Sequence, residues 1–158
     1  MEQNKYVKLH SLLRMFGALL ALVIFVSMFI ATQIYREGMS HINYSWSETF
    51  FGDGVYNKAS PAGFIGYLFI IIGGLAGLAF VFIDEMIGKD LTKKLSFGVG
   101  AAMIVGGALI LLNGVFFRAI NEVSFDYRLA AGPIVFGILG VLAGAMDVAA
   151  PILEEKGY

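Results

Sequence analysis

Residues 15–35 read MFGALLALVIFVSMFIATQIY, an uncharged run between Arg14 and Arg36. At about 1.5 Å per residue, a helix of these 21 residues reaches about 31 Å, which matches the roughly 30 Å hydrocarbon core of a bilayer. The run is longer than the roughly 7–15 apolar residues of a secretory signal peptide, and no A-x-A cleavage pattern closes it. We therefore predict a retained membrane-spanning helix at about residues 13–35.

Three further uncharged runs follow the first. They cover residues 59–83, 95–117 and 129–146, and the last resumes after Asp147. Backbone in lipid must satisfy its hydrogen bonds within a helix or a closed barrel, and no alternating barrel pattern is visible. The sequence therefore predicts an all-α integral membrane protein, a four-helix bundle that forms one domain over residues 1–158. The remaining helices are expected at about residues 60–83, 95–117 and 129–150.

The composition supports this fold class and excludes one class of partner. Hydrophobic residues make up 58% of the chain and charged residues only 15%, whereas soluble domains carry about 45–50% apolar and about 25% charged residues. We therefore expect most of the chain to lie in a lipid bilayer. The formal charge is −1, from 11 basic and 12 acidic residues, so no basic field favours a nucleic-acid partner.

Lysine and arginine predict the orientation, because cytoplasmic loops are enriched in them. With the N-terminus inside, seven basic residues fall on the cytoplasmic side, namely Lys5, Lys8, Arg14, Lys89, Lys93, Lys94 and Lys156. Four fall outside, namely Arg36, Lys58, Arg118 and Arg128. We therefore expect both termini in the cytoplasm and a long first extracytoplasmic loop over residues 36–58. Short loops, no cysteine and no targeting tail favour a bacterial cytoplasmic membrane.

The long loop is aromatic, which argues against a disordered linker. The alternation from Ile42 to Trp46 predicts a short extended segment, and the Gly-Asp-Gly run at residues 52–54 predicts a turn. The rings fit two interpretations, an aromatic belt in the headgroup layer or a folded surface that docks a partner. The candidate docking residues are Tyr44, Trp46, Phe50 and Phe51.

Glycine is the most informative residue type in the membrane, because 14 of the 20 glycines lie in the last three predicted helices. Pairs such as Gly73 and Gly77 form small-xxx-small motifs, which let two helix backbones approach closely. They indicate either packing inside one bundle or a second surface for other subunits. The candidate packing residues are Gly63, Gly66, Gly73, Gly77, Gly98, Gly106, Gly140 and Gly144.

Asn113 is a polar residue within the third predicted span, where polar groups are costly unless paired. At 100° per residue it shares a face with Gly106, so it points into a helix contact. The simpler interpretation is an interhelical hydrogen bond. The alternative is coordination of an ion or a small ligand.

Asp147 interrupts the last apolar run on the face that carries Gly144. We expect the helix to reach the membrane surface there, so that Asp147 pairs with Lys93 or Lys94. The alternative is an acid that carries protons or binds a cation, together with Asp84 and Glu85 at the same depth. A carrier would need a second ionisable group near the middle of the bilayer, and the sequence offers none.

The sequence lacks the residues for most cofactor and catalytic sites. It contains no cysteine, and its two histidines, His10 and His41, are expected on opposite sides of the membrane. Bis-histidine haem and zinc with cysteine and histidine ligands are therefore not expected. No P-loop, G-x-S-x-G or paired catalytic carboxylates occur. The sequence predicts neither a cofactor nor an enzyme.

Two functional hypotheses remain. The first is a non-enzymatic structural or accessory subunit of a larger membrane protein complex, which packs through its glycine-rich helix faces on other subunits or on itself. The second is a small homo-oligomeric channel or transporter, with Asn113 and Asp147 along a path shared between copies. A membrane enzyme would need a cluster of titratable groups in a cleft, and the residues present argue against one.

Overall fold

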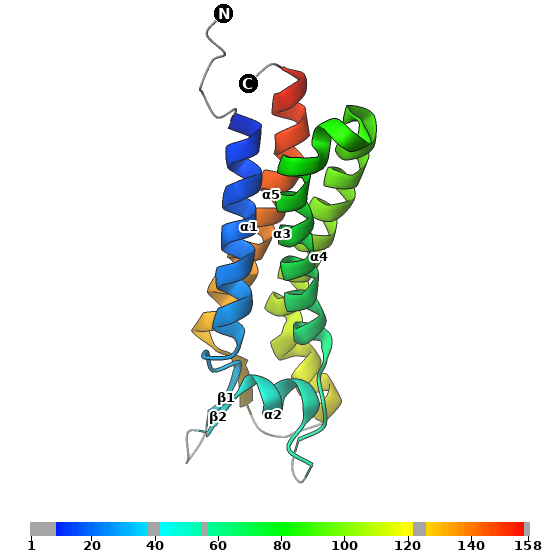
Figure 1. Ribbon diagram of the computed structural model, residues 1–158. Coiled ribbons are helices and arrows are strands. Elements are labelled where there is room, and N and C mark those ends of the chain that lie inside the picture. The colour runs from blue at the N-terminus through cyan, green and yellow to red at the C-terminus, as the bar shows by residue number, and fades with distance from the viewer. Residues whose placement is uncertain (1–8, 38–41, 55–56, 122–125, 157–158) are drawn as a thin grey trace, which may run out of the picture.

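The computed structural model describes residues 9–37, 42–54, 57–121 and 126–156, without the side chains of Asp84, Glu85 and Lys89. Within these residues it is 79% helical. Four helices are long and apolar enough to cross a membrane. They are α1 (Leu9–Met28), α3 (Ala62–Ile87), α4 (Lys89–Asn121) and α5 (Ala131–Glu155), which run lengthwise beside one another (Figure 1).

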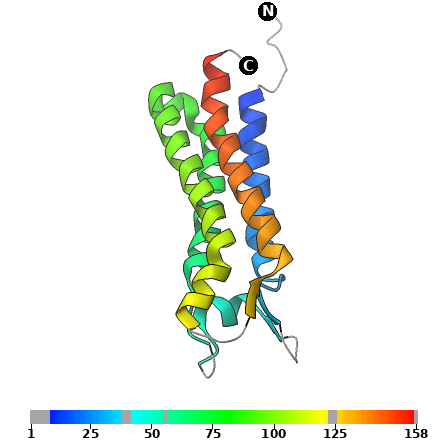
Figure 2. The same cartoon turned by 180° about the vertical axis from the view of Figure 1, so that it is seen from behind.

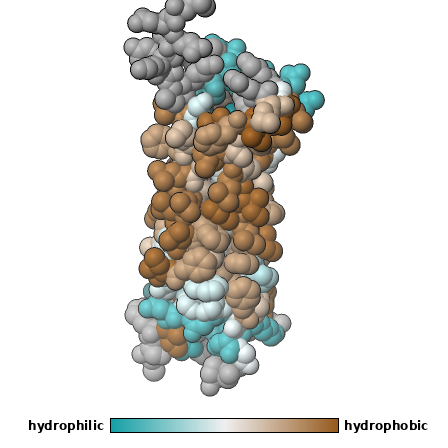
Figure 3. All heavy atoms as spheres, viewed as in Figure 1, coloured by the Kyte–Doolittle hydropathy of each residue, from teal (hydrophilic) through white to brown (hydrophobic). Residues whose placement is uncertain are grey.

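The surface of the bundle is divided into an apolar band and two polar ends. Figure 3 shows hydrophobic side chains along the middle of the molecule and hydrophilic ones at both ends. Large side chains are exposed within the band, among them Phe16 and Ile72, which are 57% and 62% exposed. Such side chains gain from contact with lipid and would be unfavourable in water.

Each long helix packs on two neighbours. α1 and α4 lie on opposite sides of the bundle, each in contact with both α3 and α5, while α3 and α5 touch each other much less (Figures 1 and 2). The core between them contains Ile24 of α1, Tyr67 and Ile70 of α3, and Met103 of α4, which are all fully buried.

Pairs of glycines bring α4 close to both of its neighbours. A Cβ atom at Gly106 would lie 2.6 Å from the carbonyl oxygen of Gly66 in α3. The adjacent Gly107 faces α5, where its Cβ atom would lie 2.6 Å from the carbonyl oxygen of Gly137. A third pair, Gly100 and Gly144, approaches in the same way. Hydrogen in place of a side chain is therefore what allows these backbones to meet.

A small sheet and a short helix cover one end of the bundle. Strands β1 (Ile34–Glu37), β2 (Ile42–Tyr44) and β3 (Asp126–Leu129) form an antiparallel sheet in the order β2-β1-β3. Helix α2 (Trp46–Phe51) lies at the same end (Figure 1). We call this unit the sheet-end layer. The expectation of an all-α protein is therefore wrong at this end, because the connections before α3 and before α5 pair with each other as strands.

Ser45 starts helix α2 with a capping box. Its hydroxyl accepts a hydrogen bond from the Glu48 N–H at 3.5 Å, and its own N–H donates to the Glu48 carboxylate at 2.8 Å. The Ser45 hydroxyl also donates to that carboxylate at 2.7 Å. The hydrogen bonds from the Ser45 side chain and backbone lower the pKa of Glu48 below its ordinary value of 4.5.

Replacing Ser45 should therefore destabilise the protein. We expect Ser45→Ala to lower the free energy of unfolding by about 1 kcal/mol, and the neighbouring Ser47→Ala to change it by less than about 0.5 kcal/mol. Because the folded-state pKa of Glu48 is lowered, the stabilisation is fully present above pH 4.5 and is lost as the pH falls through the lowered pKa. Denaturant unfolding at neutral and at acidic pH tests this prediction. A difference in free energy of unfolding between Ser45→Ala and Ser47→Ala that is larger in acid would contradict it.

The helix ends differ from those predicted. α1 ends at Met28 and not at residue 35, because the Gln33 side-chain amide donates to the Met28 carbonyl at 3.0 Å and the chain then enters β1. α4 and α5 extend beyond the uncharged runs, to Asn121 and Glu155. A charged residue marks where lipid ends, whereas a helix can continue into water. Pro151 lies inside α5.

The predicted extended segment is only partly a strand. Ile42–Tyr44 forms β2, but Trp46 begins α2, because the Ser45 cap turns the chain into a helix. The Gly-Asp-Gly turn has positive φ angles of 78° at Gly52 and 75° at Gly54, which favour glycine. Three residues used in the predictions lie outside the described residues. They are His41, one of the two histidines, and Lys5 and Lys8, two of the basic residues expected in the cytoplasm.

Candidate functional site

The sheet-end layer has an aromatic interior. Tyr44 of β2, Phe117 of α4 and Tyr127 of β3 are buried against one another, with ring centroids 5.1–5.8 Å apart. The Tyr127 hydroxyl donates to the Asn57 side chain at 3.4 Å. Burial, and then the hydrogen bond with Tyr44, raise the pKa of Tyr127 to about 12, so this phenol stays neutral at physiological pH. These contacts join both connections to the end of α4.

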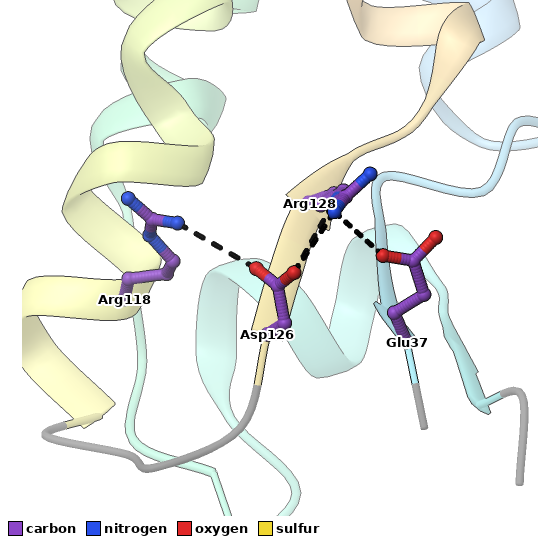
Figure 4. A network of polar contacts seen from close by, with 4 residues as sticks. All are labelled: Glu37, Arg118, Asp126 and Arg128. Atoms are coloured by element: carbon purple, nitrogen blue, oxygen red, sulfur yellow. Dashed lines mark hydrogen bonds and ion pairs between the residues drawn. The ribbon is translucent and has the colours of Figure 1, made fainter. Parts of the chain in front are cut away.

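The exposed face of the same layer carries alternating charges. Figure 4 shows Arg128 between Glu37 and Asp126, with N–O distances of 2.7 and 3.0 Å, and Arg118 at 3.8 Å from Asp126. These side chains come from β1, β3 and α4, and each is about half exposed. Exposed ion pairs contribute at most about 1 kcal/mol each. The network therefore matters more as a charged surface than as a source of stability.

The four predicted docking residues divide between the interior and the surface. Tyr44 is 7% exposed and Phe50 is fully buried, so in this structure neither can contact a partner. Phe50 packs on the rings of Phe64 and Tyr67 in α3. Trp46 is half-buried, and Phe51 is 57% exposed. Sequence alone could not separate them, because all four are aromatic and lie within eight residues.

Asn113 joins α4 to the beginning of α3. Its side-chain oxygen accepts hydrogen bonds from the Gly63 N–H at 3.2 Å and from the Ser60 hydroxyl at 3.4 Å, and the residue is 1% exposed. The N–H groups in the first turn of a helix have no partner within the helix. The Asn113 side chain is the partner of one such N–H group in α3. This is the interhelical hydrogen bond of the simpler interpretation.

Asp147 lies inside the bundle and not at its surface, which corrects the expected pairing with a lysine. The residue is 1% exposed, and within the described part of the chain neither carboxylate oxygen has a hydrogen-bond partner. A Cβ atom at Gly77 would lie 2.7 Å from one of these oxygens, so the carboxylate is pressed against α3. Lys93 instead pairs with Glu155 at the end of α5.

Arg14 is the second buried charge at this depth. It is 1% exposed, donates to the Ser96 hydroxyl of α4 at 3.3 Å, and lies 3.9 Å from the Glu154 carboxylate. Gly17, one turn further along α1, faces Asp147, because a Cβ atom there would lie 3.9 Å from its carboxylate. Sequence reasoning missed this role, because it uses Arg14 only as the boundary of an apolar run and as one of the basic residues that predict the orientation. A signal was present, since Arg14 belongs to the inward-facing positions His10, Arg14, Gly17, Ala21, Ile24 and Met28.

Most of the predicted packing glycines face a neighbouring element. Cβ atoms at Gly66 and Gly106 would meet the backbone of the opposite helix. The predicted Gly144 packs on Gly100, which the sequence analysis did not single out. Side chains stand beside the others: Asn113 and Phe50 at Gly63, Met103 at Gly73, Asp147 at Gly77, and Ile70 at Gly140. Gly98 differs, because no atom of the described chain would lie within 4 Å of a Cβ atom there. It is exposed on the outer face of α4, so it does not pack within the bundle.

The chain matches no protein-family model, and no curated protein matches it. Its class therefore rests on the fold. Four apolar helices, an apolar band and two polar ends place it among helical-bundle membrane proteins.

Proposed function

We propose that this protein is a non-enzymatic structural or accessory subunit of a larger membrane protein complex. The observation that carries the proposal is the sheet-end layer, in which two connections far apart in sequence fold into one unit with a charged outer face. Connections that served only to link helices would need no shared sheet. Surface segments held on a rigid scaffold are common sites of recognition.

The layer is built to keep a fixed shape. Its strands pair over residues 34–37 with 126–129, and Tyr127 fills the space behind them. Binding to a rigid surface costs little conformational entropy, so a modest area suffices for a stable contact. The partner surface should carry complementary charges that face Arg118 and Glu37. The candidate docking residues are therefore those of the charged network and exposed Phe51, and not the buried Tyr44 and Phe50.

Orientation and location are part of the same proposal. We place the sheet-end layer outside a bacterial cytoplasmic membrane and both termini inside. The excess of lysine and arginine at the end where α1 begins and α5 ends supports this orientation.

A path shared between copies has less support. Asn113 and Asp147 are each 1% exposed and lie inside a single chain, so neither side chain faces a second copy. We therefore keep the accessory subunit as the one proposed function. Glycine packing in the core supports it too, because the close contacts of α4 make a stiff bundle that can hold the layer in place.

The test is recovery of partners after gentle extraction from the native membrane, followed by native mass spectrometry. The unmodified chain should be recovered with other membrane proteins in fixed stoichiometry. Arg118→Glu, which reverses a charge among the candidate docking residues, should lower this recovery at least about threefold, in line with the loss of one or two polar contacts. Lys156→Glu is the matched control at the opposite end and should change nothing. A chain recovered only as a monomer, without a partner, would refute the proposal.

A further inference from the structure

A groove runs along the lipid-facing side of the bundle between α3 and α4. Its volume is about 420 Å³. Small residues on both helices leave it open, because Ala76, Gly98 and Ala102 fill little space and nothing in the described chain stands within 4 Å of a Cβ atom at Gly98. Larger apolar side chains form its walls, including Phe69 and Leu95.

The groove ends at a positive charge. Lys94 lines it one helical turn before Gly98, at the N-terminal border of the uncharged run over residues 95–117. Lys94 is exposed, and it makes no ion pair with any described residue, whereas its neighbour Lys93 pairs with Glu155. From Lys94 to Ala102 the groove follows eight residue steps of α4, or about 12 Å.

A second groove provides an internal comparison. It lies between α1 and α3, has a similar volume of about 410 Å³, and is lined only by apolar residues such as Leu12, Phe16 and Leu75. Lipid tails can fill either groove. Only the groove between α3 and α4 places a cation where a lipid headgroup would lie.

We propose that the groove between α3 and α4 binds one anionic phospholipid, with an acyl chain along Gly98 and Ala102 and the phosphate at Lys94. An acyl chain fits a dry, apolar groove, and a lysine near a membrane surface extends its ammonium group towards the headgroups. The inference is independent of the proposed function, because it concerns the lipid-facing surface and not the sheet-end layer.

The first test separates the charge of Lys94 from general surface charge. The purified full chain in detergent is titrated with phosphatidylglycerol or phosphatidylcholine, and lipid-bound protein is counted by native mass spectrometry. One lysine near a membrane surface contributes about 1 kcal/mol, so Lys94→Gln should weaken phosphatidylglycerol binding about fivefold. It should weaken phosphatidylcholine binding much less, because the choline cation balances the charge of the phosphate in that lipid. Lys93→Gln is the matched control and should leave both unchanged. Equal phosphatidylglycerol binding by the unmodified and Lys94→Gln proteins, or equal losses in the two variants, would overturn the proposal.

The second test fills the groove. A Cβ atom at Gly98 has no described neighbour within 4 Å, so Gly98→Leu should fold normally, and its longer side chain should reduce binding of both lipids about tenfold by occupying the space of the acyl chain. Ala101→Leu adds the same side chain at another exposed position of α4 and should not reduce binding. Lipid binding by Gly98→Leu equal to that of Ala101→Leu would overturn the location. If Gly98→Leu does not fold, the comparison of Lys94→Gln with Lys93→Gln decides.

Discussion

Gly107→Ala should lower the free energy of unfolding by about 1–3 kcal/mol, the cost that is typical of overpacking a close contact. The added methyl group would lie 2.6 Å from the Gly137 carbonyl oxygen and 2.8 Å from the Val141 nitrogen. Both atoms belong to the backbone of α5, which cannot move away as a flexible side chain can. Because α4 packs on α3 through the adjacent Gly106, moving α4 aside would strain that contact as well.

Gly98→Ala is the matched control on the same helix. A methyl group there meets nothing within 4 Å in the described chain, and alanine favours a helix over glycine by about 1 kcal/mol. Gly98→Ala should therefore be as stable as the unmodified protein or slightly more stable. Unfolding in mixed micelles with increasing denaturing detergent, followed by circular dichroism, measures both. Equal stability of the two variants would mean that α4 does not depend on its glycine contacts.

The four helices could be predicted from the sequence because each depends on a local pattern. An uncharged run long enough to span a bilayer is visible without knowledge of the fold, as is the alternation that forms β2. The sequence places only the first half of strand β1 in the first helix, since Ile34 and Tyr35 continue an apolar run. Two interactions end α1. The Gln33 side chain donates a hydrogen bond to the Met28 carbonyl, and the chain then pairs as β1 with β3, about 90 residues away. Neither has a local signal, and the short β3 has none either.

The candidate site could be predicted in part for the same reason. The face of Asn113 followed from helical rotation, but its partners Ser60 and Gly63 depend on where α3 begins. The depth of Asp147 depends on where α5 ends. Because α5 continues to Glu155, Asp147 lies two turns before the end of the helix, inside the bundle and not at its surface. The sequence shows which residues carry charge, but it does not show that Asp147 and Arg14 are buried, because their burial depends on how the helices pack.

Arg14→Gln should cost about 3–5 kcal/mol, because removal of one partner leaves the other buried charges uncompensated. Arg14 is 1% exposed and 3.9 Å from the Glu154 carboxylate, and Gly17, one turn along the same helix, faces the buried Asp147. The matched control is Arg118→Gln, which removes an exposed arginine 3.8 Å from Asp126 and should cost less than about 1 kcal/mol. The same unfolding titration measures both.

A double substitution separates charge from packing. If Arg14 serves mainly to balance Asp147, Arg14→Gln combined with Asp147→Asn should be more stable than Arg14→Gln alone, because the buried acid that has lost its counter-charge is then neutral. If Arg14 serves mainly through its hydrogen bond to Ser96 and its packed stem, the second substitution should recover nothing. If Arg14→Gln lowers the free energy of unfolding no more than Arg118→Gln does, the buried charges do not contribute to stability. Recovery in the double variant would instead show that a buried acid in the membrane is tolerated because α1 supplies its counter-charge.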